Sequence, residues 1–465
     1  GNLGLIVAED ALSFYLFFAL MSFSSYGLIV HRRSADALRA GRVYIALVVL
    51  GEVLMFAGFL TAAWQAGTVY IEAMAANVRS DLVIGLLVAG FAIKAGALPL
   101  HVWLPLAHPV APVPASAVLS GAMIKAGLLG WLRFLPLGTV ALPEWSAVFV
   151  TAGLAAAVFG MLVGLLQDQS KTVLAYSSIS QMGFMTVCIG IGMAAPDAWP
   201  MCLSAVLLYA LHHAFAKGTL FLGVGVAAAS GKDTVQRWLV GSGLSFAAMA
   251  LAGLPMTSGA IAKSALSSLS GYLWPDGISL MLSMLAIGTT LLMARFLYLV
   301  WPRGKHESPI AAGLWIPWTF ALLAVALCTL LWPRNHSPAP HTLSVAAIWH
   351  ALWPGVTGAT IALAVLWRNR KSPIRLPLRI PAGDILWLMS RLSIAIGQVW
   401  SVLVNHLRHF IGRLQSCANR AYRRIAALDP AGYAEATFHH WTVSGLAFIC
   451  LLLAVFLALG FAASS

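Results

Sequence analysis

The sequence predicts an all-α polytopic membrane protein with about twelve transmembrane spans. Of its 465 residues, 60% are hydrophobic and only 9% are charged, and the mean hydropathy is +0.87. Soluble domains carry roughly 25% charged residues, so this composition excludes an ordinary soluble fold. Apolar runs close to the ~20 residues that cross a bilayer recur along the chain. We expect spans at residues 11–31, 43–65, 82–99, 115–135, 146–166, 171–193, 200–228, 238–272, 278–301, 312–332, 341–366 and 438–460.

The net charge of +13 is divided unequally between the loops on the two sides of these spans. One side carries little beyond Arg79 and Arg334. Such asymmetry is the positive-inside signal, which predicts that the basic side is cytoplasmic and favours the inner membrane of a prokaryote. Random scatter of the basic residues is the alternative. The basic side holds Arg32, Arg33, Arg39, Arg42, Lys171, Lys232, Arg237, Arg303, Lys305, Arg368, Arg370, Lys371, Arg375, Arg379, Arg408, Arg413, Arg420, Arg423 and Arg424.

Cofactor and nucleotide motifs are not found. No two cysteines form a CxxC pair, so the spacing of zinc and iron–sulfur sites is missing. No glycine-rich phosphate loop follows a strand pattern. We expect no cofactor, metal or catalytic centre in this chain and no nucleic-acid partner. The cysteines are interpreted as buried small apolar residues: Cys188, Cys202, Cys328, Cys417 and Cys450.

The region after residue 384 has a different pattern from the spans. Its apolar residues recur at intervals of three and four, whereas Arg391, Arg408 and Arg413 lie off that stripe. This pattern predicts a long amphipathic helix along the cytoplasmic interface, followed by an anchoring span. A solvated cytosolic helix is the alternative. The stripe consists of Ile385, Leu388, Leu392, Ile396, Val399, Leu403, Leu407 and Ile411.

Four lysines lie inside apolar runs: Lys94, Lys125, Lys217 and Lys263. A charge at the centre of a bilayer costs about 2.5–3.5 kcal/mol on insertion scales, so such residues normally face protein or water. Glu52 adds a carboxylate within an apolar run, and His212 and His213 precede Lys217. One lysine could belong to a structural ion pair, but four on successive helices indicate an ion path.

The chemistry of these residues suits proton transfer. Burial favours neutral lysine and a nearby carboxylate favours charged lysine, so a moving partner can switch the amine. Histidine titrates near neutrality. A metal at His212 and His213 is disfavoured because adjacent helical residues diverge by about 100°, and His101, His108 and His213 do not suggest haem ligation. Hydroxyl groups that could hold water between the lysines are those of Ser116, Ser120, Tyr176, Ser177, Ser178 and Ser180.

Two helices are interrupted beside a lysine. Lys94 precedes Pro99 by five residues, and Lys263 follows Pro255 by eight. Breaks on opposite sides of the lysine are what an inverted repeat would leave, and discontinuous helices commonly line an ion path. Ordinary proline kinks are the alternative. The predicted organisation is two inverted five-helix repeats at residues 1–135 and 136–301, two spans at 302–366, a lateral helix at 367–430 and an anchoring span at 431–465.

Four stretches together resemble a known family: "KAGALPLHVWLPLAHPVAPVPASAVLSGAMIKAGLLG", "QDQSKTVLAYSSISQMGFM", "HHAFAKGTLFL" and "LAGLPMTSGAIAKS". They are similar to the antiporter-like subunits of respiratory complex I, Mrp-type cation/proton antiporters and group 4 membrane-bound hydrogenases such as formate hydrogenlyase. The resemblance covers most of residues 5–300. "SGAMIKAG" favours the hydrogenase and Mrp branches.

The resemblance implies roles for individual residues. Lys94 matches the central proton carrier of the first half-channel, and Lys263 the terminal lysine of the second. The residues between them match linking positions: Lys125, with Ser120 where complex I versions often have histidine, then Lys217 and His213, with Tyr209 where another histidine is often found. The amphipathic region resembles the lateral helix that straps neighbouring subunits together. Implied partners are other antiporter-like and small helical membrane subunits, and peripheral redox subunits that would hold iron–sulfur or nickel–iron centres.

Two departures from the family bear on function. Ala19 stands where the family has the glutamate that partners the first lysine, which leaves Glu52 as the remaining carboxylate for Lys94. The family also begins with further helices, so we expect a truncated or split subunit. The predicted function is proton or cation translocation in a redox-driven complex. The alternatives are an Mrp-type Na⁺/H⁺ antiporter subunit and a non-conducting scaffold; an enzyme is disfavoured because no nucleophile or cofactor motif is present.

Overall fold

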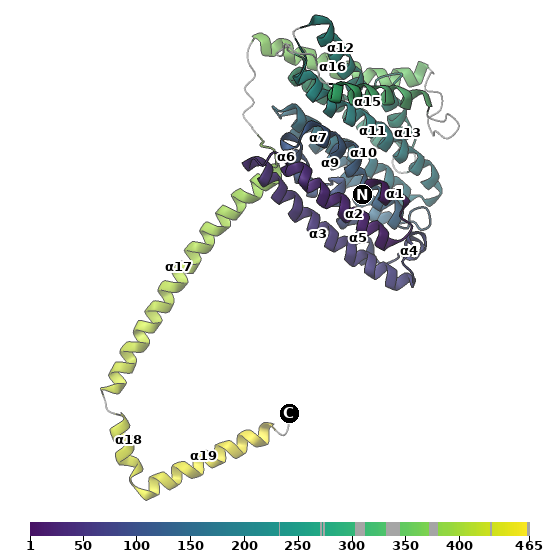
Figure 1. Ribbon diagram of the computed structural model, residues 1–465. Helices are drawn as coiled ribbons and strands as arrows, with labels where there is room; N and C mark the ends of the chain where they lie inside the picture. Colours follow the sequence, from purple (N-terminus) through teal and green to yellow (C-terminus); the bar gives the residue numbers. More distant parts are fainter. Residues whose placement is uncertain are drawn as a thin grey trace. The chain divides into compact units, whose positions relative to one another are not determined.

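The structure is a computed structural model that describes all residues except 232, 270–271, 273–274, 303–311, 332–344, 372–379, 428–429 and 463–465 (Figure 1). Within the described residues the regular secondary structure is helical and contains no strand. The chain divides into two compact units, Gly1–Trp387 and Leu388–Ser465. The predicted all-α polytopic membrane class is confirmed, whereas the division into inverted repeats stays a prediction.

The first unit begins with helices on the amino-terminal side of the chain. Phe14, Phe18, Phe59, Phe91 and Phe134 pack together at their centre with ring centroids 4.3–6.2 Å apart. The elements are α1 (Asn2–Val7), α2 (Ala11–Val30), α3 (Ala35–Ala66), α4 (Ile71–Asn77), α5 (Asp81–Ala95), the 3₁₀ turn η1 (Leu100–Val102), α6 (Trp103–Val110), α7 (Val113–Val118), the π-helical turn η2 (Leu119–Met123) and α8 (Ile124–Phe134).

The unit continues with longer helices that surround α10, and the second unit holds the last ones. Figure 1 shows α9, α10 and α11 at the centre of the bundle. The elements are α9 (Pro143–Leu165), α10 (Ser170–Ala194), the 3₁₀ turn η3 (Pro196–Ala198), α11 (Trp199–Ala228), α12 (Thr234–Ala252), α13 (Ser258–Ser268), α14 (Pro275–Val300), α15 (Ala312–Leu331), α16 (Val345–Lys371), α17 (Asp384–Ala426), α18 (Pro430–Phe438) and α19 (Trp441–Ala462).

Ordinary capping chemistry sets the ends of these helices. Asp10, Ser34 and Thr257 begin α2, α3 and α13, because each side chain accepts a hydrogen bond from a backbone amide three residues ahead. Gly96 and Gly253 end α5 and α12 in the left-handed region, at φ 71° and 82°, where a side chain would be strained. Both interruptions that the prolines predicted are therefore present.

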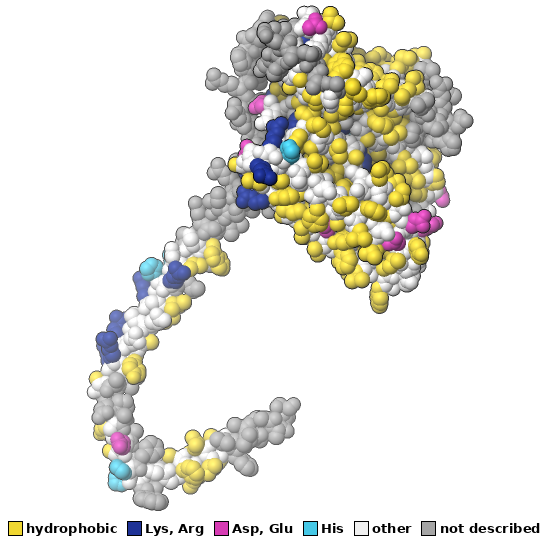
Figure 2. Space-filling view, in the orientation of Figure 1, with side chains coloured by type: hydrophobic (Ala, Val, Ile, Leu, Met, Phe, Trp, Pro, Cys, Tyr) yellow, Lys and Arg dark blue, Asp and Glu magenta, His cyan; other side chains and the backbone are white. Residues whose placement is uncertain are grey.

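Ten described helical segments are long and apolar enough to cross a membrane, where the sequence predicted about twelve. The predicted span at 238–272 is divided into α12 and α13, of 19 and 11 residues. In α19 the described apolar part covers only Ser444–Ala454. Figure 2 shows hydrophobic side chains covering most of the visible surface of the first unit, as expected for contact with lipid.

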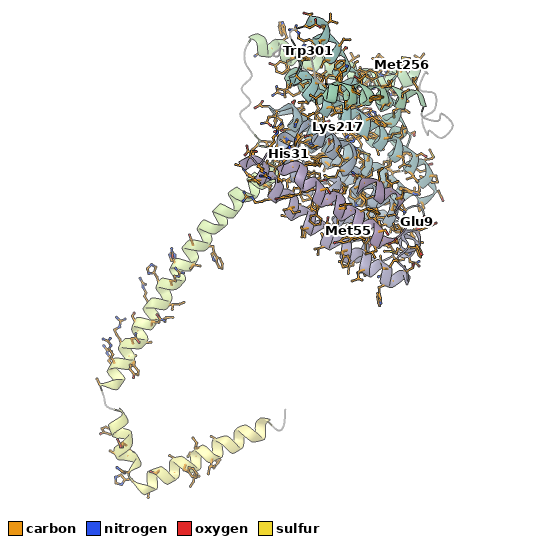
Figure 3. All side chains as sticks on the ribbon, in the orientation of Figure 1. Glu9, His31, Met55, Lys217, Met256 and Trp301 are labelled. Carbon is orange, nitrogen blue, oxygen red and sulfur yellow. The ribbon has the colours of Figure 1, made fainter. Side chains whose placement is uncertain are left out.

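The basic side chains of the first unit gather near the loop between α2 and α3, close to His31 (Figures 2 and 3). Arg32 and Arg33 are exposed there, in agreement with their predicted loop position, whereas Arg39 is exposed but lies within α3. Lys171 differs, because it lies in the first turn of α10, is only 9% exposed and donates to the Ala111 carbonyl at 2.6 Å. The predicted loop residues Lys232, Arg303, Lys305, Arg334, Arg375 and Arg379 lie outside the described residues.

The second unit contains most of the predicted amphipathic helix as a single element, α17. Figure 2 shows basic and hydrophobic side chains on opposite sides of this helix. Arg408 and Arg413 are exposed, and Ile411 is 45% exposed; the side chains of Leu388, Leu392, Ile396, Val399, Leu403 and Leu407 lie outside the described ones. The interpretation of all five cysteines as buried is wrong for two: Cys417 lies on α17 and Cys450 on α19, and both are exposed because these helices lack a packed core.

Candidate functional site

The central helix α10 is enclosed by protein along its whole membrane-spanning window. It nevertheless carries polar side chains, including Tyr176, Ser177, Ser178 and Gln181, each at most 1% exposed. A buried polar group without a partner costs about 1–3 kcal/mol, so these groups must be paired inside the protein. Small residues let α9 approach closely: a Cβ at Gly153 would lie 2.7 Å from the Gly183 carbonyl. Helix α10 is therefore the polar axis of the bundle.

Lys94 ends α5 beside the first interruption and is 2% exposed. Its ammonium donates to the Tyr44 hydroxyl at 3.1 Å and lies 5.4 Å from the centre of the Phe18 ring. Tyr44 in turn donates to the Ser22 carbonyl at 2.9 Å. At the interruption the Ile93 carbonyl accepts a hydrogen bond from the Trp103 indole at 2.7 Å. Lys94 is held by a hydroxyl and aromatic rings rather than by a carboxylate.

Glu52, the predicted partner of Lys94, lies on α3 and is 5% exposed. It is near enough for its charge to act on Lys94, yet the two make no ion pair within 4 Å. Tyr44 is two helical turns before Glu52, about 12 Å along the axis, and that spacing brings the hydroxyl rather than the carboxylate to the lysine. Glu52 Oε1 has no hydrogen-bond partner. Ala19 is half-buried on α2, and from that helix Phe18 contacts the ammonium.

Lys125 follows the π-helical turn η2, in which the Ile124 amide donates to the Leu119 carbonyl five residues earlier. Such wide turns are rare and are frequent at functional sites. The Lys125 ammonium bends back and donates to the Ser120 carbonyl at 2.6 Å. Tyr44 connects this turn to the first interruption, because its hydroxyl also lies 3.8 Å from the sulfur of Met123.

A series of hydrogen bonds leads from η2 to Lys217 on α11. Figure 3 labels Lys217 within the bundle. The hydroxyls of Ser120 and Ser178 are 2.8 Å apart, and Ser178 donates to the Leu174 carbonyl at 3.1 Å. Lys217 donates to the same carbonyl at 2.7 Å and to the Ser177 hydroxyl at 2.8 Å. Lys125 and Lys217 are 92 residues apart in sequence, and both bind this polar group: Lys125 binds the Ser120 carbonyl, and Lys217 binds Ser177 and the Leu174 carbonyl.

His213 is fully buried and lies within reach of the charges of Lys125 and Lys217. Neither of its ring nitrogens has a hydrogen-bond partner. The neighbouring His212 points to the second interruption, where its Nδ1 lies 2.7 Å from the Ser258 hydroxyl at the start of α13. The two histidines therefore extend in different directions, as adjacent helical positions require, and connect the centre of the bundle to the break between α12 and α13.

Lys263 closes that second interruption. Its ammonium donates at 2.5 Å to the Ala252 carbonyl, the last residue of α12, and lies 6.0 Å from the centre of the Phe184 ring. A free carbonyl at a helix end carries negative partial charge and favours a cation. Lys94 and Lys263 thus both contact an interruption, one before it and one after it, as the sequence indicated.

Tyr209 belongs to a side branch of the network. Its hydroxyl donates to Gln181 at 2.8 Å, and the Gln181 amide donates to Thr289 on α14 at 3.3 Å. The ring stacks on Phe184 and stands edge-on to His212, with centroids 5.9 and 6.3 Å apart. Tyr209 therefore positions neighbours of Lys263 and His212 and does not lie between two lysines.

Sequence reasoning missed two buried groups. His108 stacks on Phe221 with centroids 4.5 Å apart, lies within reach of the charges of Lys171 and Lys217, and has no partner on either nitrogen. Asp384, at the start of α17, contacts His101 and Tyr176. The motif "PLHVWLPLAH" contains His101 and His108, so both could have been named as candidates. No sequence pattern links Asp384 to Tyr176, which is more than 200 positions away.

The described residues contain no group of three or more His, Cys, Asp or Glu side chains placed to hold a metal ion. The residues that meet in the bundle are amines, imidazoles and hydroxyls. These groups exchange protons readily and need no bound cofactor to do so.

Residues 8–288, which include every predicted site residue, match the family model described as "NADH:quinone oxidoreductase/Mrp antiporter, TM". The chain belongs to this family. The antiporter-like family is the one that the four sequence stretches indicated.

Individual members of the antiporter-like family differ in the complexes to which their names refer. Hydrogenase-4 component B of Escherichia coli is 34% identical over 233 residues, covering 48% of this chain and 35% of that protein. The putative antiporter subunit mnhA2 of Staphylococcus epidermidis is 28% identical, with 91% and 56% covered. F(420)H(2) dehydrogenase subunit N of Methanosarcina mazei is 27% identical, with 70% and 71% covered.

The fold is shared with a solved member of the antiporter-like family. A chain in the structure of the Mrp complex from Dietzia sp. DQ12-45-1b superimposes with a TM-score of 0.64 at 23% identity, covering 86% of this chain and 47% of that one. This chain spans 35% of hydrogenase-4 component B and 45% of mnhA2 from Staphylococcus haemolyticus, so it corresponds to part of the length of these relatives.

Proposed function

We propose that this chain conducts protons across the membrane as an antiporter-like subunit of a redox-driven multisubunit complex, of the complex I or membrane-bound hydrogenase type. Its membrane would be the cytoplasmic membrane of a prokaryote, with the basic loops on the cytoplasmic side. The observation that carries the proposal is a polar series in which Lys125 binds the Ser120 carbonyl, the Ser120 hydroxyl binds that of Ser178, and Ser178 and Lys217 share the Leu174 carbonyl.

This series has the chemistry that proton transfer requires. A hydroxyl both donates and accepts, so Ser120 and Ser178 can reverse their shared hydrogen bond. The Leu174 and Ser120 carbonyls only accept, so a proton does not pass through either of them. They hold the ammonium groups: Leu174 places Lys217 beside Ser177 and Ser178, and Ser120 places Lys125 near its own hydroxyl. Transfer between the amine and these hydroxyls then needs only a rotation or one bridging water.

Buried nitrogens and oxygens without protein partners lie near the first interruption and along the series. They are found on Glu52 and Ser22 beside Lys94, on His213 near Lys125 and Lys217, and on His108. Such groups are normally satisfied by ordered water, and a site with several of them favours water over an empty cavity. These positions support a hydrated polar path between Lys94 and Lys263.

The driving complex would act on the charges of this path. Two ionisable groups in contact titrate as a pair, so a change of charge at one end alters proton affinity at the next. Lys94 and Lys263 would be the terminal amines, with Lys125, Lys217 and His213 between them and His212 leading to Ser258. The redox centres would lie in partner subunits, together with homologous and small helical membrane subunits.

The decisive experiment compares variants of Lys217 in everted membrane vesicles that carry the complete complex. Vesicles receive NADH, formate or a sodium pulse in turn, and acidification is followed with a ΔpH-sensitive dye. Lys217→Gln and Lys217→Arg should both lower proton transport by about tenfold or more, because glutamine carries no charge and arginine does not release its proton. Arg39→Gln, at an exposed position near the start of α3, is the control. Full transport in both Lys217 variants would refute conduction through this series.

A second candidate function is that of an Mrp-type Na⁺/H⁺ antiporter subunit. The observation in its favour is that mnhA2 of Staphylococcus epidermidis aligns with 91% of this chain. The same vesicles separate the two candidates. Acidification changes that follow the sodium pulse and not an electron donor support antiport, whereas the reverse supports a redox-driven complex.

A non-conducting scaffold is favoured by a different observation, the absence of a carboxylate within ion-pair distance of the described Lys94. It predicts that Lys94→Ala and Lys263→Ala leave proton transport by the assembled complex intact. Reduced transport in either variant, with normal amounts of complex, excludes it.

A further inference from the structure

A carboxylate enters the first unit from the chain segment that leads into α17. Asp384 Oδ2 lies 3.3 Å from His101 Nε2 and accepts a hydrogen bond from the Tyr176 hydroxyl at 2.9 Å. The other oxygen accepts from the Ile385 amide at 2.5 Å. The side chain of Asp384 is 7% exposed and that of His101 is fully buried. Both carboxylate oxygens are therefore fixed in direction at the edge of the bundle.

The segment before Asp384 is fitted to the bundle closely. Gln167 donates through its side-chain amide to the Ile380 carbonyl at 3.1 Å. Gly383 has φ of 86°, and a Cβ there would meet Leu106 at 3.0 Å, so only glycine is accommodated without strain. Gln167 precedes α10 at the end of the bundle that holds Lys171. This is the end with the basic loops, which the sequence assigns to the cytoplasm.

His101 connects this carboxylate to the interior. It follows Lys94 by seven residues and lies in η1, the turn that bridges the first interruption. Its Nε2 faces Asp384, whereas its Nδ1 is buried with no protein partner. The ring contacts Phe159 edge-on, with centroids 5.1 Å apart, so its orientation is restrained. An imidazole with a carboxylate on one nitrogen and a free second nitrogen has the two-sided geometry of a proton relay.

The groups around Asp384 favour its ionised form, so a proton taken from His101 would be released readily to water. Burial raises the pKa of Asp384, but hydrogen bonds from His101, the Ile385 amide and Tyr176 outweigh burial and hold its pKa below the usual value. The titratable groups that face Asp384 are His101 and Tyr176. Arg295 is the next charged group, and it binds the Gln167 carbonyl and Asp168 instead.

We propose that Asp384 and His101 form a proton-transfer pair that connects the aqueous face at the start of α17 with the interrupted helix that carries Lys94. A proton that reaches His101 Nδ1 from the interior lets the Nε2–H bond break while an O–H bond forms at Asp384 Oδ2. The electron pair of the broken bond stays on Nε2, so the ring remains neutral, and Asp384 then releases its proton to water. The reverse sequence brings a proton in.

This inference rests on the proposed function, because a relay has a purpose only if the lysine series conducts. It adds an element that the family resemblance did not assign, a carboxylate from the segment outside the helical repeats. The competing role is a purely structural one, in which Asp384 only fastens the start of α17 to α10 and η1. The two roles make different predictions for a side chain that has the same shape but cannot exchange a proton. Such a side chain would support proton transport if Asp384 is structural, and would not if Asp384 is part of a relay.

The test uses the complete complex in everted vesicles, energised by whichever of NADH, formate or a sodium pulse acidifies wild-type vesicles. Asp384→Asn keeps acceptor oxygen and size but cannot carry the proton. We expect normal amounts of complex, proton transport lowered by about tenfold, and a larger ratio of rates in H₂O and D₂O. Asp384→Glu should restore transport to within about threefold of wild type.

The outcomes separate the two proposals. Normal transport and an unchanged isotope ratio in Asp384→Asn, with loss of complex only in Asp384→Ala, would overturn the relay and leave a fastening role. Loss of transport in Lys217→Gln together with normal transport in Asp384→Asn would refute the relay and leave conduction through the lysines standing. Normal transport in Lys217→Gln would refute conduction through the lysines, regardless of the result for the Asp384 variants. His101→Gln should behave as Asp384→Asn does, because it removes the second member of the pair.

Discussion

Lys217 and Ser178 donate to the same acceptor, the backbone carbonyl of Leu174, at 2.7 and 3.1 Å. The ammonium comes from α11 and the hydroxyl from the enclosed helix α10, one turn beyond the carbonyl. This shared acceptor fixes the amine beside the pair of serine hydroxyls that leads to Lys125.

The serine pair gives the first prediction. Ser178→Ala removes the hydroxyl that joins Ser120 to the Leu174 carbonyl, so proton transport should fall by at least several-fold, on the order of one hydrogen bond of about 1 kcal/mol or more. Ser120→Ala should have the same effect, and the double variant should be no worse than either single one. Ser180→Ala on the same helix is the control, because its hydroxyl binds only the Ala157 carbonyl. Additive losses in the double variant would contradict a shared link.

The second prediction concerns the environment of Lys94. Tyr44→Phe removes its hydrogen-bond acceptor and leaves a buried ammonium facing only rings, which should destabilise the first unit by about 1–3 kcal/mol. Glu52→Gln leaves that bond in place and should lower transport with little change in unfolding temperature. Thermal unfolding of the purified complex and vesicle acidification measure the two effects, with exposed Glu72→Gln as the control. A loss of stability in Glu52→Gln and none in Tyr44→Phe would show that Glu52, rather than Tyr44, is the partner that stabilises Lys94.

Gly253 gives the third prediction, because it combines a φ of 82° with contact to Lys263. In Gly253→Ala the new Cβ would lie 2.8 Å from Lys263 Cδ, and the left-handed backbone adds about 1–3 kcal/mol of strain. We expect a lower unfolding temperature and weaker transport, since the ammonium must leave the Ala252 carbonyl. Gly27→Ala, where no atom lies within 4 Å of the new Cβ, should be neutral or slightly stabilising.

The fourth prediction is a pH dependence at the start of α2. Asp10 caps this helix, and its hydrogen bond to the Ser13 hydroxyl, at 2.6 Å, lowers the pKa of Asp10. A lowered pKa contributes stability that is complete above the unfolded value of about 3.9 and is lost as the pH falls through the folded value. Hydrogen exchange of the Ser13 amide, which donates to Asp10 at 2.8 Å, reports this loss.

The control for that measurement is Asp10→Asn, since asparagine caps a helix about as well but does not titrate. The ratio of protection between wild type and Asp10→Asn should stay constant down to about pH 4 and fall below it. A ratio that does not change through the acid range would show that the carboxylate charge has no part in the cap.

The sequence predicted those features that depend on local chemistry. The four lysines and the two interruptions could be read from residue type and spacing, because the cost of membrane insertion and the effect of proline on a helix are local. Tyr44 as the direct partner of Lys94 was not predicted, because opposite charge suggested Glu52. The two lie on one helix, and only its register against α5 decides which of them reaches the amine.

Long-range contacts and subtle helix geometry escaped prediction for physical reasons. Asp384 and Tyr176 are 208 positions apart, and no periodicity encodes their meeting. The π-helical turn at Leu119–Met123 consists of residues that an ordinary helix also accepts. Its formation depends on packing against α11, where a Cβ at Gly121 would lie 3.3 Å from the Ala214 carbonyl. Tertiary contacts decided both features.

That wide turn has a consequence for how the chain tolerates change. The turn holds one residue more than an α-helical turn, so a single-residue deletion within Leu119–Met123 that restored α-helical geometry would leave the two flanking helices nearly in phase. A deletion in the regular helix α8 would instead rotate the residues beyond it by about 100° around the helix axis. Gain or loss of one residue is therefore absorbed at this turn, and the direction in which Lys125 points is preserved.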